Sequence, residues 1–125
     1  MQAKHELRIG DYISSPTKNG ESIITALFEE YVFVNKEEQP VNYVELGLIK
    51  IGISLLKNAG FYPAEQTWEW KHDALPDHTL KVSYDGIARF KHVGKRENNT
   101  RNFNYTHQLQ HEFERLTNRQ LAIKW

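Results

Sequence analysis

The chain has 125 residues, enough for one domain with a single hydrophobic core and too few for two independent domains. We therefore expect residues 1–125 to form a single domain. The 16 basic and 16 acidic side chains cancel, so no net charge draws the whole molecule to nucleic acid or to an anionic membrane. The sequence contains no cysteine, which excludes disulfides, thiolate nucleophiles and thiolate metal sites and fits a reducing cytoplasm.

The N-terminal residues are polar, and no run approaches the ~18 apolar positions that a membrane helix needs. The sequence therefore predicts neither a secretory leader nor a membrane span. Aromatic residues make up 12% of the chain, a content that favours a sheet-rich core or a binding surface over a plain helical bundle.

The first predicted element is a strand over residues 6–13, where apolar and polar side chains alternate before a turn-rich stretch. Residues 23–27 and 31–35 combine β-branched and aromatic side chains on either side of Glu29 and Glu30, and they predict a pair of strands. Short strands entered through an Ile-Gly-Asp turn are compatible with a small SH3-like barrel in the N-terminal part.

A polar break separates these strands from the middle of the chain. Residues 43–51 have the composition of a further strand, and residues 52–61 predict a short helix. Gly60 stands where such a helix needs a left-handed residue at its C-terminus, and Phe61 is placed to fold back and close it.

The second half of the chain predicts several more short strands. They cover residues 67–72, 79–84, 88–93, 101–105 and 121–125. Asp85-Gly86 predicts a hairpin with a tight primed turn, because this pair tolerates positive φ angles. Trp68 and Trp70 share one side of the first of these strands, a spacing typical of core residues and, less often, of a stacking platform or a dimer contact.

Residues 103–117 predict an amphipathic helix. Leu109, Phe113 and Leu116 are spaced i, i+4, i+7 and share one side of it, and Thr106 is placed to cap its first amides. Together the elements predict an α+β fold with a mainly antiparallel sheet of short strands. A short central helix and the C-terminal helix are expected to pack on that sheet.

Two histidines on the C-terminal helix, His107 and His111, have the i, i+4 spacing that lets imidazoles share a metal ion. Gln108 stands where a zinc protease needs its glutamate base, and the helical projection turns both imidazoles toward water. We therefore expect no metal site here. The alternative sites for a His-based hydrolase are His107, His111 and Glu114, or His72, Asp73 and His78.

The predicted hairpin region, residues 84–105, interleaves cations with aromatic residues, as surfaces that stack bases and pair with phosphates do. An ordinary hairpin, in which strand alternation turns the cations toward solvent, explains the same sequence pattern. The candidate ligand-binding residues are Tyr84, Arg89, Lys91, Arg96, Arg101, Phe103 and Tyr105.

Sequence motifs for catalysis are lacking. The chain has no nucleophile elbow, no paired-carboxylate motif and no glycine-rich phosphate loop, since its seven glycines are dispersed. No cofactor is therefore predicted, and the sequence favours binding over catalysis.

Three short motifs carry a resemblance to a family. They are Leu-Arg-Ile-Gly-Asp-Tyr at residues 7–12, Leu-Leu-Lys-Asn-Ala-Gly-Phe at 55–61, and Tyr-Thr-His-Gln-Leu-Gln at 105–110 with Leu-Thr at 116–117. The chain resembles a family of small uncharacterised proteins of Bacteroides-type bacteria and their phages and prophages. That family has a Leu-Arg-x-Gly-Asn-Tyr/Trp opening, a Leu-Leu-x-x-Gly-Phe element and a helix with His-Gln-Leu-Gln that ends in Leu-Thr-Gly. This sequence departs from the pattern at Thr106, His111 and Asn118.

The resemblance implies a small α+β protein in a phage or mobile-element setting, in the cytoplasm of a bacterial host. Such proteins often act by stoichiometric binding, so the expected partner is a nucleotide signal of host defence or a host protein. A homo-oligomer fits the same expectation. The alternatives are a nucleic-acid-binding module that uses the hairpin of residues 84–105 and the His-based hydrolase.

Overall fold

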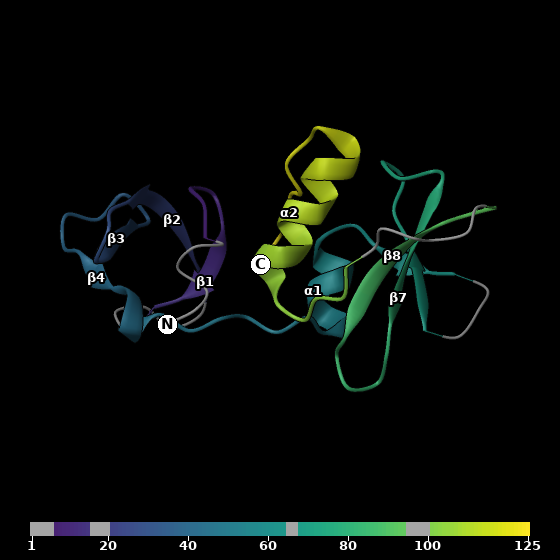
Figure 1. The fold of residues 1–125 in the computed structure, drawn as a ribbon, viewed down its shortest axis with the longest axis horizontal. Coiled ribbons are helices and arrows are strands. Elements are labelled where there is room, and N and C mark those ends of the chain that lie inside the picture. Colours follow the sequence, from purple (N-terminus) through teal and green to yellow (C-terminus); the bar gives the residue numbers. More distant parts are fainter. Residues whose placement is uncertain (1–6, 16–20, 65–67, 95–100) are drawn as a thin grey trace. The chain divides into compact units, whose positions relative to one another are not determined.

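The computed structural model describes residues 7–15, 21–64, 68–94 and 101–125. It confirms the α+β class, with two antiparallel sheets of short strands and two α-helices (Figure 1). The chain divides into two compact units. Unit 1 comprises residues 1–49 and 105–108, and unit 2 comprises residues 50–104 and 109–125. The single domain expected from chain length stays a prediction.

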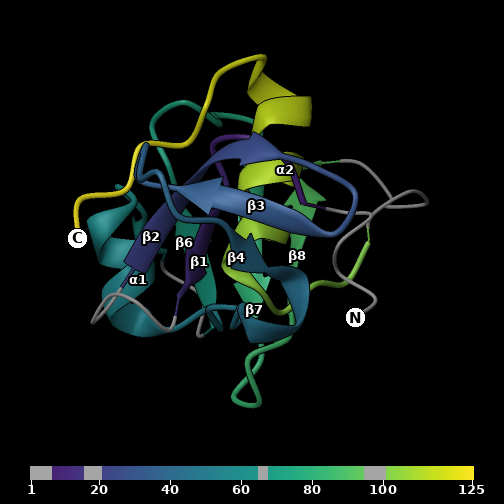
Figure 2. The same ribbon diagram turned by 90° about the vertical axis from the view of Figure 1, so that its left-hand side faces the viewer.

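Unit 1 contains the first sheet. Its strands are β1 (Tyr12–Ser14), β2 (Glu21–Leu27), β3 (Tyr31–Val34) and β4 (Val41–Asn42), which pair antiparallel in that order. The sheet curls into a half-barrel, as expected for an SH3-like N-terminal part, and Figure 2 shows β2 and β3 side by side along it. Its interior is filled by Leu7, Ile13, Ile24, Val32, Val34, Val41, Tyr43 and Leu46.

The hairpin β2–β3 confirms the predicted pair of strands. Val32 and Val34 are fully buried, whereas Tyr31 and Phe33 alternate with them and lie on the outer face. The strands join through a two-residue loop, since Leu27 pairs with Val32 and the Phe28 amide donates to the Tyr31 carbonyl at 2.9 Å.

The strand predicted at residues 6–13 is wrong for residues 7–11, and Glu6 lies outside the described residues. A turn replaces it: the Asp11 carboxylate accepts from the Arg8 amide at 2.8 Å, and the Asp11 amide donates to the Arg8 carbonyl at 3.1 Å. Gly10 has a φ of +97°, which bends the chain before β1 begins.

The strand predicted at residues 43–51 is also wrong. The side-chain oxygen of Asn42 accepts from the Val44 amide at 3.4 Å and starts a 3-10 turn, η2 (Tyr43–Glu45). A hydrogen bond from a side chain to a nearby backbone amide competes with pairing between β-strands. After it, Gly47 pairs with Ser14 in an isolated bridge.

Unit 2 contains the second sheet. Its strands are β5 (Tyr62–Pro63), β6 (Glu69–Lys71), β7 (His78–Val82) and β8 (Ala88–His92), again antiparallel in chain order. The three predicted strands at residues 67–72, 79–84 and 88–93 are confirmed in shorter form as β6, β7 and β8, with Thr67 outside the described residues.

The predicted hairpin at Asp85-Gly86 is confirmed, but the primed turn is wrong. The Ser83 amide donates to the Ile87 carbonyl at 2.8 Å, and the Gly86 amide donates to the Ser83 carbonyl at 3.0 Å. Positive φ occurs in this loop only at Gly86, with +86°. The connection is therefore a three-residue loop, a type I turn followed by a left-handed glycine.

Residues 101–105 do not form the predicted strand. Phe103 exchanges both backbone hydrogen bonds with Ala88, at 2.7 and 2.8 Å, but this pairing is an isolated bridge. The next carbonyl, of Asn104, accepts from Ile51 at 3.2 Å. The segment changes partners after one residue, which prevents a continuous ladder.

Residues 121–125 have no regular secondary structure and do not form the predicted last strand. Leu121 and Ile123 are buried in unit 2. The Lys124 amide donates to the Asn58 carbonyl at 2.9 Å, so this segment satisfies one of the free carbonyls at the end of a helix rather than a sheet edge.

That helix is α1 (Ile53–Asn58), and its predicted ending is confirmed. Gly60 has a φ of +90°, and its amide donates to the Lys57 carbonyl at 3.1 Å. The Phe61 amide donates to the Leu56 carbonyl at 2.9 Å, and the Phe61 side chain is buried. These bonds form a Schellman motif.

The C-terminal helix is α2 (Thr106–Thr117). Leu109 and Phe113 are buried as predicted, and Leu116 is half-buried. The ring of Phe113 lies 4.9 Å from that of His72 and 6.4 Å from that of Phe61, measured between centroids, so this part of α2 belongs to the core of unit 2.

Two expectations for the first turn of α2 are wrong. Thr106 is already helical, and among the described residues its buried hydroxyl has no hydrogen-bond partner. The amide of Tyr105 instead donates to the side chain of Gln108 at 3.2 Å, which is one half of a capping box. His107 does not face water, because only 1% of its surface is exposed.

Candidate functional site

A groove with a volume of about 550 Å³ lies in unit 2, beside the hairpin β7–β8. This volume is in the range that holds small-molecule ligands. The lining residues that bear on ligand chemistry are Trp68, Glu69, Lys81, Tyr84, Ile87 and Arg89.

Two exposed aromatic rings line the groove. Trp68 is 58% exposed and Tyr84 is 88% exposed, with Ile87 beside them at 43%. Trp68 precedes β6 and has a φ of +68°, a left-handed conformation that is rare for a bulky side chain. The expectation that Trp68 belongs to the core is therefore wrong. Strained residues of this kind cluster at binding sites.

The cations of the groove come from neighbouring strands. Lys81 of β7 lies opposite Arg89 of β8 and opposite Glu69 of β6, so the three side chains share one face of the sheet. The Lys81 ammonium lies 3.7 Å from the Glu69 carboxylate, and Arg89 is exposed. One positive charge in excess favours an anionic ligand.

The loop that presents Tyr84 is ordered by its own side chains. The Ser83 hydroxyl contacts the Asp85 carboxylate and accepts from the Ile87 amide at 3.2 Å. Hydrogen bonding from Ser83 lowers the pKa of Asp85, so this carboxylate stays ionised and keeps its bond at neutral pH. Tyr84 is thereby held at the tip of the hairpin.

A second groove of about 430 Å³ adjoins the first, and both are lined by Trp68 and Tyr84. Its remaining walls are mostly apolar. They include Ile51, Ile53, Leu56, Pro63 and Trp70. The surface of unit 2 thus offers a cationic recess next to an apolar one, and two aromatic side chains line both.

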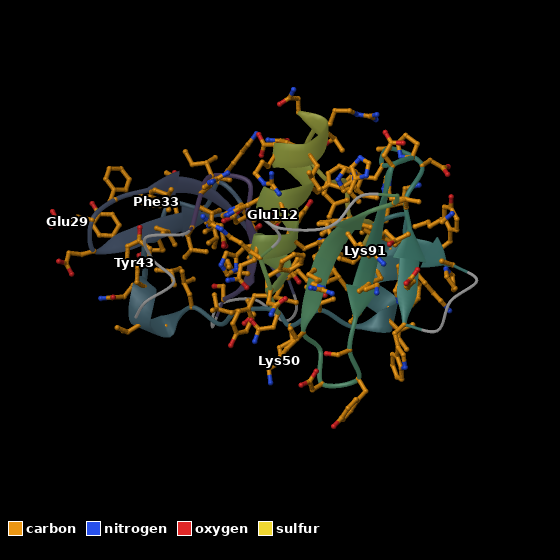
Figure 3. The ribbon with its side chains drawn as sticks, turned by 45° about the vertical axis from the view of Figure 1, so that its right-hand side comes forward. Glu29, Phe33, Tyr43, Lys50, Lys91 and Glu112 are labelled. Atoms are coloured by element: carbon orange, nitrogen blue, oxygen red, sulfur yellow. The ribbon has the colours of Figure 1, made fainter. Side chains whose placement is uncertain are left out.

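The structure brings some of the predicted residues together. Tyr84 and Arg89 line the same groove. Lys91 lies two residues after Arg89 in β8, so the two side chains share one face of the sheet (Figure 3). Lys91 is half-buried and does not line the groove. Arg101 is exposed, next in the chain to a lining residue. Arg96 lies outside the described residues.

The two other predicted stacking residues are elsewhere. Phe103 is only 5% exposed, and its ring centroid lies 5.9 Å from that of Phe90, so it is a core residue. Tyr105 belongs to unit 1, where its ring stacks on His107 with a centroid separation of 6.2 Å. Neither side chain contributes to the groove.

The histidines proposed for a hydrolase are engaged structurally. Among the residues that the structure describes, no group of three His, Asp or Glu side chains could hold a metal ion. His72 accepts from the Ala74 amide through Nδ1, and its Nε2 lies 3.0 Å from the Ala59 carbonyl. Asp73 accepts from the Tyr62 hydroxyl at 3.1 Å.

Three more histidines belong to these alternatives, and one of them, His111, is half-buried on α2. The ring of His78 lies 4.8 Å from that of His92, its partner across the hairpin β7–β8. His107 is buried, whereas Glu114 on the same helix is exposed. The His-based hydrolase therefore stays a prediction, without a metal-holding group among the described residues.

The sequence pattern assigned Trp68 to the core, with a stacking platform as the alternative, and Lys81 was missed. Lys81 could have been found, because pairing the strands around Asp85-Gly86 places it opposite Arg89. No sequence signal marks the left-handed backbone that exposes Trp68, because this conformation is disfavoured for a tryptophan and follows from the surrounding fold.

Comparisons with models of known families, with curated proteins and with solved structures each give no match to this chain. The family resemblance of the short motifs therefore stays a prediction. Neither of the two described helices has the length and apolar character that crossing a bilayer requires.

Proposed function

We propose that this chain is a binding protein whose unit 2 takes an aromatic, anionic small molecule, and that a nucleotide is the ligand class that fits best. The observation that carries the proposal is the joining of Trp68 and Tyr84 with Lys81 and Arg89 in one groove. Rings can stack a base, and the cations can pair with phosphate oxygens.

The charge and exposure of these groups support a ligand rather than a structural role. Arg89 is exposed, and the half-buried Lys81 lies at 3.7 Å from Glu69, so both cations can reach an anion in the groove. The rings of Trp68 and Tyr84 are largely exposed to water. A stacked base would bury their apolar surface, which is favourable.

The setting of this activity is proposed on the resemblance alone. A cytoplasmic phage or prophage protein that sequesters a nucleotide signal of host defence would use such a groove. Blocking of a host protein is the other role that the resemblance implies.

Thermal-shift screening against cyclic and linear nucleotides, followed by calorimetry, tests the proposal. We expect one or more nucleotides to stabilise the protein, and Arg89→Gln to weaken binding by about tenfold through loss of a charge-assisted hydrogen bond. The matched control is Lys57→Gln, an exposed cation on α1 outside the groove, which should bind as the parent does. A flat response to every nucleotide would eliminate the idea.

Trp68→Gly separates binding from stability. Glycine relieves the left-handed strain of about 1–2 kcal/mol, which offsets the lost packing of a half-exposed ring. We therefore expect the free energy of unfolding to change by less than about 1 kcal/mol, while loss of stacking costs about 1–3 kcal/mol in nucleotide affinity. Equal affinity of the variant and the parent would place the ligand elsewhere.

A second candidate is a single-stranded nucleic acid, and the shared sheet face of unit 2 favours it. Lys71, Lys81, Arg89 and Lys91 lie on that face by strand register. A strand bound along it releases counterions, so its affinity must fall steeply with salt, and Lys71→Gln must weaken it. A mononucleotide in the groove should be insensitive to Lys71→Gln.

A further inference from the structure

Unit 1 carries a cluster of aromatic rings on the outer face of the hairpin β2–β3, formed by Phe28, Tyr31 and Phe33. The rings of Phe28 and Tyr31 stack with centroids 5.0 Å apart, and Phe33 meets them edge-on at 5.7 and 5.8 Å. Phe28 is 49% exposed and Tyr31 is 37% exposed. We call these three residues the aromatic cluster.

The aromatic cluster is held in place by the buried side of the hairpin. The hydroxyl of Tyr43 donates to the Phe28 carbonyl at 2.7 Å, and the Tyr43 amide lies 3.5 Å from the Glu30 carbonyl. Burial raises the pKa of Tyr43, so this hydroxyl stays a donor at neutral pH. Figure 3 places Phe33, Glu29 and Tyr43 at the same end of unit 1. A loop fixed in this way needs little ordering when a partner binds.

Two carboxylates adjoin the aromatic cluster in the chain. Glu29 and Glu30 form the loop between Phe28 and Tyr31, and both are exposed. Residues 21–49 contain six glutamates and a single lysine, although the whole chain is neutral. The lysine, Lys36, follows β3 at the end away from this loop. Residues 21–49 are therefore acidic, and Glu29 and Glu30 are the carboxylates that adjoin the aromatic cluster in the chain.

We propose that the aromatic cluster is a docking site for an extended, arginine-bearing segment of a partner protein. A guanidinium stacks on aromatic faces and pairs with carboxylates through its planar fork, so it is complementary to both parts of the surface. The apolar stem of arginine and its neighbours in the segment cover the remaining ring surface. All residues of this site lie in unit 1, and the proposal does not rest on the nucleotide groove.

Labelled peptides test this proposal with the whole chain. Short peptides with one central arginine and varied flanking residues are compared, by fluorescence anisotropy, with the same peptides carrying citrulline, which keeps the shape and removes the charge. We expect arginine peptides to bind at least about tenfold more tightly than their citrulline counterparts. Amide shifts of residues 26–33 on titration would locate the contact.

Variants of the hairpin sharpen the test. Tyr31→Ala and the double variant Glu29→Lys, Glu30→Lys should each reduce arginine-peptide affinity by about tenfold or more. The matched control is Glu38→Lys, an exposed carboxylate in the connection that follows β3, which should leave most of the affinity. Amide spectra of the hairpin show whether each variant remains folded.

Three results would overturn the proposal. One is that no arginine peptide binds more tightly than its citrulline counterpart. Another is that Glu38→Lys reduces binding as much as the change at Glu29 and Glu30, which would reduce the effect to bulk charge. The third is a dimer of this chain that Phe28→Ala dissociates, because the aromatic cluster would then be covered by a second copy.

Discussion

His72 is a titratable residue whose hydrogen bonds fix its protonation state. The Ala74 amide donates to Nδ1 at 3.0 Å, so this nitrogen must be unprotonated, and the proton on Nε2 is donated to the Ala59 carbonyl at 3.0 Å. The ring also packs between Phe61 and Phe113, with both centroids at 4.9 Å. Burial lowers the pKa of His72, against smaller opposing effects of Ala59 and Asp73.

This geometry predicts that acid destabilises the protein through His72. The folded-state pKa lies below the unfolded value of 6.5, so the unfolded chain takes up a proton first as the pH falls below that value. Stability attributable to His72 is therefore complete above pH 6.5 and declines toward the folded pKa. His72→Gln keeps a donor for Ala59 but loses the ring that packs between Phe61 and Phe113, so the variant should be less stable at pH 8. Because glutamine does not titrate, the variant should lose less stability than the parent between ~pH 7 and pH 5. Urea denaturation across this range measures both effects, and an unchanged pH slope in the variant would contradict the assignment.

Single side chains were the least predictable feature of this sequence. The helical projection turned His107 outward because Leu109, Phe113 and Leu116 define an apolar stripe. The buried part of α2 is wider than that stripe and includes His107 and Gln110, which are polar. Hydrophobic periodicity detects only the apolar residues of a buried face, so polar residues at its margin are assigned to water.

At the scale of elements, the ending of α1 gives a direct test of backbone strain. Gly60→Ala should lower the free energy of unfolding by about 1–2 kcal/mol, because a side chain disfavours a φ of +90°. The added methyl would also lie 3.0 Å from Nε2 of His72 and disturb its bond to Ala59. The control is Gly52→Ala, since Gly52 has a φ of −145° and open space around it. Thermal or urea unfolding that shows equal losses for the two variants would rule out the strain.

Elements with a complete local signal were predicted from the sequence. The pair β2 and β3 has β-branched and aromatic residues on either side of two glutamates, and the hairpin β7–β8 and the end of α1 each have a glycine with positive φ. Residues 101–105 and 121–125 have the composition of strands, but their backbone partners are single residues distant in the chain. Composition reports β-propensity and cannot report the presence of a neighbouring strand.

At the scale of the whole molecule, helix α2 links the two units through the chain. Its first residues belong to unit 1, where the Thr106 amide donates to the Ile49 carbonyl at 2.7 Å. The rest belongs to unit 2, where Leu109 and Phe113 are buried. The helix has 12 residues, and a helix this short is marginal in water without tertiary packing. Unfolding of unit 2 should therefore also unfold the first turn of α2, which belongs to unit 1.

We accordingly expect the units to unfold in one transition, as the single domain predicted from chain length requires. The three tryptophans, Trp68, Trp70 and Trp125, all belong to unit 2, so tryptophan fluorescence reports on that unit alone. Amide hydrogen exchange in β2 and β3 reports on unit 1. The two probes should give the same denaturant midpoint, and Leu109→Ala should lower both midpoints equally, since a buried leucine truncation costs about 2–5 kcal/mol. Separate midpoints, or a shift of the fluorescence midpoint alone, would show that the units fold independently.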